Sequence, residues 1–181
     1  MAALLARVAS WNPANLTVPY RAAEVSRAFW KQSAVLLQGT GRRTWDPGGC
    51  VRVVHDDHVE LSFGWQTSPA ANRACGCSIM LSKRVWPRGT LQGWWAPPSE
   101  IQGRAGAALV RRGSLSVLFV SLYFVPPGQL AHVRRQVAAR ILGWLGGLLA
   151  LPKVRRAKVV IGMDFNEKLA TRFRRTMLAR A

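Results

Sequence analysis

The sequence contains few acidic residues: eight Asp and Glu stand against 26 Lys and Arg, and the formal net charge is +18 at pH 7. Because carboxylates are so few in this chain, each one is a candidate for a role in structure or chemistry and not simply a solvated surface residue. The positive charge favours a polyanionic partner, because Lys and Arg gain free energy when they replace counterions condensed on phosphates. DNA or RNA is therefore the partner that we expect, with an anionic membrane surface as the alternative.

Long apolar runs and paired cysteines are also lacking. No run of 18 apolar residues occurs, which excludes a membrane-spanning helix. The three cysteines, Cys50, Cys75 and Cys77, are odd in number and lack the paired CxxC spacing of a structural zinc site, so they predict reduced thiols. We expect an intracellular protein, with the nucleus as one compartment. The acid-free N-terminal segment favours a first strand, and an organellar transit peptide is the alternative.

The length of 181 residues, 49% apolar content and eight Trp predict a single domain over residues 1–181. Hydrophobic periodicity predicts a strand, a helix and a strand at the N-terminus, the unit from which parallel sheets covered by helices are built. Later segments predict a hairpin, a long helix and a strand buried on both faces. The expected strands are 4–11, 33–38, 51–54, 59–63, 78–81, 106–110, 115–125 and 159–163, and the expected helices are 18–32 and 129–149.

Two stretches of the middle region allow more than one interpretation. The segment His55-Asp56-Asp57-His58 predicts a solvated turn between two strands, with a metal site as the alternative. Trp94 and Trp95 are expected in a loop rich in Gly and Pro, where they could stack on bases.

Asp164 follows the expected strand 159–163 directly, and open α/β sheets bind ligands at the carboxyl ends of their strands. The alternative is a helix N-cap, because Glu167 stands at the third position of a capping box.

Four separate segments, "ASWNPANL", "AVLLQGT", "SLYFVPPG" and "VVIGMDFNE", together resemble the endonuclease/exonuclease/phosphatase superfamily. This superfamily includes deoxyribonuclease I, apurinic/apyrimidinic endonucleases and the endonuclease domains of non-LTR retrotransposons. The resemblance covers about residues 5–169. It implies an α/β fold, a helix-covered two-sheet β-sandwich, and an activity like that of Mg²⁺-dependent phosphodiester nucleases of mobile elements.

The resemblance also implies roles for four residues. Asn12 and Asp164 match positions of the metal and phosphate network, and Asp164 matches the Asp that orients or deprotonates the attacking water. Asn166 matches an Asn that contacts the phosphate, and Tyr123 matches a Tyr that lies against the scissile phosphate. Taken alone, Asn12 before a proline is a turn residue and Tyr123 is a half-buried core residue.

Two departures from the family pattern put catalysis in doubt. The family's second strand ends in Gln-Glu-Thr, whose Glu is the principal metal ligand, whereas this chain has Gln38-Gly39-Thr40. The family's closing Ser-Asp-His motif has no counterpart, since no His follows Asp164. We therefore expect the first sheet and part of the second.

Three functions remain open from the sequence: a nuclease of weak or lost activity, a non-catalytic nucleic-acid-binding remnant, and a phosphatase of phospholipids or inositol phosphates. The basic residues that we expect to contact nucleic acid are Arg42, Arg43, Arg104, Arg111 and Arg112.

Overall fold

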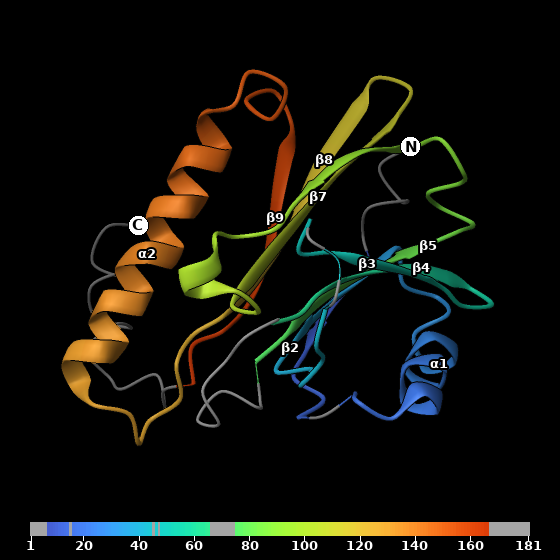
Figure 1. Ribbon diagram of the computed structural model, residues 1–181. Coiled ribbons are helices and arrows are strands. Elements are labelled where there is room, and N and C mark those ends of the chain that lie inside the picture. The colour runs from blue at the N-terminus through green and yellow to red at the C-terminus, as the bar shows by residue number, and fades with distance from the viewer. Residues whose placement is uncertain (1–6, 15, 45, 47, 66–74, 167–181) are drawn as a thin grey trace, which may run out of the picture.

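Two β-sheets stacked face to face form the centre of the molecule, and one helix lies on the outer side of each (Figure 1). The structure is a computed structural model that describes residues 7–14, 16–44, 46, 48–65 and 75–166. None of the helices in these ranges is long and apolar enough to cross a membrane.

The first sheet contains five strands in the order β1-β2-β5-β4-β3. β1 and β2 are parallel and are joined by helix α1, which begins at a proline, a residue whose fixed φ suits the first helical turn. The other neighbouring pairs are antiparallel. The elements are β1 (Val8–Trp11), α1 (Pro19–Ala28), β2 (Ala34–Gln38), β3 (Val51–Val54), β4 (His58–Phe63) and β5 (Cys77–Ser82).

The second sheet contains four strands in the order β6-β7-β8-β9. β7 and β8 form an antiparallel hairpin, whereas β8 and β9 are parallel and are connected through the long helix α2. The elements are β6 (Leu91–Trp95), the 3₁₀ helix η3 (Ser99–Ile101), β7 (Ala105–Arg112), β8 (Leu115–Tyr123), α2 (Ala131–Ala150) and β9 (Lys158–Asp164).

Apolar side chains fill three layers. The largest lies between the sheets and includes Leu36, Phe63 and Phe119. A second lies under α2, and a third lies between α1 and the first sheet. Burial of these faces supplies most of the stability, because isolated helices of this length are marginal in water.

Two glycines let the sheets approach closely. A Cβ atom at Gly106 would overlap the ring of Phe63, and one at Gly162 would lie 2.7 Å from the Leu36 side chain. Beside Gly162, the Ser10 hydroxyl donates to the Gln38 side chain, which in turn donates to Ser121 on β8. The two sheets are therefore joined near β9 by hydrogen bonds as well as by packing.

Most expected elements are confirmed, including the parallel β1-α1-β2 unit, the β7–β8 hairpin and the long helix. Two expectations were wrong. The strand at 158–164 is not buried on both faces, because it lies at the edge of its sheet and exposes Val159 and Met163. Trp94 and Trp95 are not in a loop but on β6, which pairs with β7.

Candidate functional site

The strand ends that carry the candidate residues meet at one edge of the molecule. Asn12 follows β1, and Tyr123 and Asp164 end β8 and β9. Tyr123 is the register partner of Asp164, and β1 contacts β9 where the two sheets meet. β1 and β2 are parallel, as are β8 and β9, and the hydrogen bond between Asn12 and Asp164 shows that both pairs carry their carboxyl ends to the same edge of the sandwich.

Asn12 and Asp164 contact each other directly across the two sheets. Asn12 Nδ2 donates a hydrogen bond of 2.5 Å to Asp164 Oδ2, and the other carboxylate oxygen accepts the backbone N–H of Asn166 at 2.8 Å. The side-chain oxygen of Asn12 accepts the N–H of Ala14. Both carboxylate oxygens of Asp164 are thus held by N–H donors from two different segments.

Asn166 fastens the segment after β9 to the end of β8. Its φ is 51°, in the left-handed region that Asn tolerates better than most residues, and its Nδ2 donates to the Phe124 carbonyl at 2.7 Å. Phe165 stacks on Phe124 in the same segment, with ring centroids 4.9 Å apart.

Tyr123 is buried beside Asn166. Burial raises the pKa of its hydroxyl, while a hydrogen bond with Asn166 and the nearby Arg104 guanidinium oppose the rise without cancelling it. The phenol therefore stays protonated at neutral pH and can donate a hydrogen bond.

Gly39, where the resemblance places a metal-binding Glu, has no room for a side chain. Its φ is +65°, and a Cβ atom there would lie 2.7 Å from Asn12 Oδ1. The amide of Asn12 therefore fills the space into which a residue at position 39 would project.

The donor set at this edge does not fit a resident Mg²⁺ ion. Such an ion takes near-octahedral oxygen ligands, usually including one or two carboxylates. Asp164 is the sole carboxylate here among the described residues, and both of its oxygens already accept N–H groups. Across the described ranges, no group of three or more His, Cys, Asp or Glu side chains is arranged to hold a metal.

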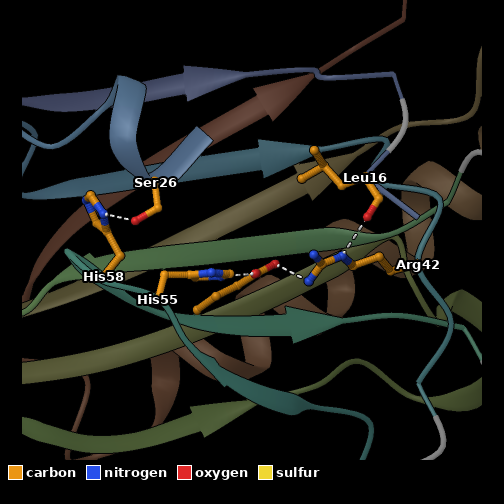
Figure 2. Close-up of polar contacts among 6 residues, drawn as sticks. Leu16, Ser26, Arg42, His55 and His58 are labelled. Atoms are coloured by element: carbon orange, nitrogen blue, oxygen red, sulfur yellow. Dashed lines mark hydrogen bonds and ion pairs between the residues drawn. The ribbon is translucent and has the colours of Figure 1, made fainter. Parts of the chain in front are cut away.

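Glu60 on β4 is a buried carboxylate that forms a polar cluster with Arg42 and His55. Its two oxygens accept hydrogen bonds of 2.8 Å, one from Arg42 Nη1 and one from the ring of His55 (Figure 2). Burial alone would raise the pKa of Glu60, but His55, Arg42 and Ser78 together hold it below its ordinary value. The sequence carried a signal for this cluster, since Glu60 lies inside the expected strand 59–63 and a Glu that is buried requires a charged partner.

The same cluster ties together the loops that follow β1 and β2. Arg42 Nε donates to the Leu16 carbonyl at 3.1 Å (Figure 2), and the Leu16 N–H donates to the Thr40 carbonyl at 2.7 Å. Glu60 thus fixes, through Arg42, the loop that contains Gly39 and the loop that follows Asn12.

The expected solvated turn at residues 55–58 is partly wrong. Asp56 is exposed, but His58 is fully buried and its Nδ1 lies 2.9 Å from the Ser26 hydroxyl on α1 (Figure 2). Burial lowers the pKa of His58. Asp56 and Asp57 precede His58, which pairs with Ser82 at the end of the sheet opposite to Gly39, so neither lies near Asp164.

The five arginines expected at a nucleic-acid surface divide into two groups. Arg42, Arg43 and Arg104 lie near the site edge, but Arg42 is paired with Glu60 and Arg104 is buried against the Tyr123 ring. Arg43 is exposed and lies over the Trp65 ring. Arg111 and Arg112 end β7 at the opposite end of the second sheet, in the hairpin that projects at the top of Figure 1.

Comparisons with known proteins bear on the fold. No family model and no curated protein matches the sequence. Among solved structures, the AP endonuclease LMAP from Leishmania major has a TM-score of 0.60 and 18% identity, and the match covers 86% of this chain and 53% of that one. The fold is that of the endonuclease/exonuclease/phosphatase superfamily.

Two further structures of this fold agree. The catalytic domain of human Nocturnin matches at a TM-score of 0.58 and 12% identity, over 97% of this chain and 69% of that chain. The 3′ phosphatase NExo from Neisseria, solved with a product DNA hairpin, matches at a TM-score of 0.56 and 19% identity. The match covers 91% of this chain and 59% of that chain. This chain therefore spans between 53% and 69% of the length of these three structures.

Proposed function

We propose that this chain binds nucleic acid through the phosphodiester backbone at the edge where Asn12, Tyr123, Asp164 and Asn166 meet, and that it hydrolyses the bond weakly or not at all. The observation that carries the proposal is the packing of Asn12 over Gly39. It leaves the phosphate-facing groups in place but fills the position of the metal-binding carboxylate.

The remaining groups are suited to bind a phosphate. Tyr123 has a protonated hydroxyl, and the Asn12 amide has two N–H donors, of which the contact with Asp164 uses one. Asp164 orders these donors, because it accepts from the Asn12 amide and from the Asn166 backbone. The net charge of +18 supplies the long-range attraction for a polyanion.

A nuclease is the second candidate. It is supported by the four residues lying together and by the fold that the chain shares with an AP endonuclease. In that case Asp164 would orient the attacking water, and the metal would need ligands from the substrate or from outside the described residues. The mobile-element character suggested by the resemblance stays a prediction.

Nicking and binding of supercoiled plasmid by the purified chain separate the two candidates. We expect binding that survives EDTA and weakens steeply between about 50 and about 200 mM salt. We expect nicking in Mg²⁺ no faster than that of the Asp164→Ala variant. Nicking that requires both Mg²⁺ and Asp164 would establish the nuclease instead.

A matched pair of arginine variants tests whether binding occurs at this edge. Arg43→Gln should lower the affinity and reduce the salt dependence by about one ion, because Arg43 is exposed beside the site. Arg111→Gln removes the same charge at the far hairpin and should change the affinity less. Equal losses would show binding by net charge alone, without a defined site.

A further inference from the structure

A cavity of about 320 Å³ opens between α1 and the loop after β1. Its walls are mostly apolar and one of them is an indole ring, while two charged side chains stand on the α1 side. We call it the Trp11 pocket. It is lined by Trp11, Pro13, Leu16, Val25 and Phe29, with Arg21 and Glu24 as the charged members.

The Trp11 pocket and the candidate phosphate site share the end of β1, where Trp11 packs on the α1 side and Asn12 turns toward Asp164. Trp11 and Pro13 are the chain neighbours of Asn12, whose amide donates to Asp164. Leu16 is held by a backbone hydrogen bond to Thr40 and by a hydrogen bond from the Arg42 side chain to its carbonyl. Three residues of the pocket wall, Trp11, Pro13 and Leu16, therefore belong to the same short stretch of chain as Asn12, which binds Asp164.

The chemistry of the pocket suits a flat heteroaromatic ring. Trp11 is 44% exposed although it packs on Phe29, with ring centroids 5.9 Å apart, so part of the indole is open to a ligand. Leu16 and Val25 add apolar surface, and the carboxylate of Glu24 offers an acceptor for the edge of such a ring. Aromatic side chains bind single-stranded nucleic acids by stacking on bases in this way.

We propose that the Trp11 pocket binds one unstacked base of a single-stranded nucleic acid whose backbone lies at Asn12 and Asp164. This inference rests on the proposed function, since it names the substrate class of the same site. A duplex keeps its bases stacked and paired inside, so the pocket would favour single strands or ends over a regular duplex.

The test compares two labelled single-stranded oligonucleotides of equal length and charge, one carrying bases and one carrying base-free sugars, by fluorescence anisotropy. The full chain should bind the base-containing strand roughly tenfold more tightly, as expected for one stacked base. Trp11→Ala should abolish this preference and leave the affinity for the base-free strand unchanged. Trp11→Phe should keep part of the preference, because a smaller ring still stacks.

Trp94→Ala is the matched control, since Trp94 is 49% exposed but lies on β6, at the sheet edge farthest from β9. It should leave the preference intact, and circular dichroism should confirm that each variant is folded. Loss of the preference in Trp94→Ala but not in Trp11→Ala would overturn the proposal. Equal binding of both strands by the unaltered chain would overturn only the proposal that the pocket binds a base. No binding of either strand would overturn both that proposal and the proposed function.

Discussion

Gly39 and Asn12 are the two residues that determine which groups the site edge can hold. Gly39 has a positive φ, and the amide oxygen of Asn12 lies 2.7 Å from the point that a Cβ atom of residue 39 would occupy, so no side chain fits there. Asn12 in turn holds Asp164. Restoring a carboxylate at position 39 therefore requires more than a single substitution.

We predict that Gly39→Glu destabilises the chain and does not create Mg²⁺-dependent nicking. The left-handed φ costs a non-glycine residue about 1–2 kcal/mol, and displacing Asn12 adds about 1–3 kcal/mol from overpacking. Urea unfolding measures the first effect, and plasmid nicking measures the second.

Gly113→Glu is the control for backbone conformation alone. Gly113 also has a positive φ, of 59°, but no atom lies within 4 Å of its Cβ position. Gly39→Glu should lose more stability than Gly113→Glu, and the difference reports the contact with Asn12. Equal losses, or nicking by Gly39→Glu, would show that Asn12 moves aside freely.

Sequence reasoning placed four site residues at strand ends but could not give their contacts. Asp164 was expected at a ligand site because it follows a strand of an α/β sheet, and the resemblance implied that Asn12, Tyr123 and Asn166 belong to the same site. The filling of the Gly39 position by Asn12 depends on a backbone angle and on the approach of two sheets. Neither quantity leaves a periodic signal in the sequence.

At the scale of elements, β4 carries the buried Glu60 that fixes two loops of the site. Arg42 reaches from the loop after β2 to Glu60, and its Nε also holds the Leu16 carbonyl. A strand in the first sheet thereby controls the position of loops at the edge of the molecule.

Glu60→Gln should lower the free energy of unfolding by about 3 kcal/mol, because Arg42 would lose the partner of its largely buried charge. It should also weaken oligonucleotide binding by loosening the loop that contains Leu16. Urea unfolding and anisotropy measure the two effects. Glu100→Gln, an exposed Glu on η3, should change stability by less than about 0.5 kcal/mol, and a similar loss in both variants would contradict the role of the cluster.

The elements themselves were largely predictable, and the exceptions have physical causes. β9 has the apolar composition of a doubly buried strand, but its place at a sheet edge is set by strand order, which hydrophobic pattern does not encode. β6 was missed because "LQGWW" contains a glycine and lies among prolines, although pairing with β7 holds it extended.

For the whole molecule, two buried titratable groups predict that stability falls with acidification. His58 has a lowered pKa, so the unfolded chain binds more protons below the ordinary value of 6.5 and stability is lost as pH falls from there. Asp57, His55 and Lys83 also act on this ring. Glu60 has a lowered pKa as well, so a second loss begins as pH falls below 4.5.

Urea unfolding over a series of pH values should therefore show two successive decreases in the free energy of unfolding. His58→Gln should remove the decrease that begins near 6.5, and Glu60→Gln should reduce the one below 4.5. A stability that stays constant from neutral pH down to 4.5 would show that His58 accepts a proton without opening the fold.

The architecture could be predicted from the order of strands and helices together with the resemblance. The tertiary contacts of single side chains could not. His58 was expected at the surface because its neighbours are polar, yet the Ser26 hydroxyl on α1 partners it inside the fold. A contact between residues far apart in the sequence is invisible to local patterns.

The hydrogen bond between Asn12 and Asp164 joins residues 152 positions apart in the chain. Contacts of such separation form late in folding, since a long loop must close before they stabilise anything. During synthesis from the N-terminus the first sheet can therefore assemble before Asp164 leaves the ribosome, with Asn12 still unpaired. Ligand binding at this edge would then report the completion of folding, because no N-terminal portion that ends before Asp164 contains both halves of the site.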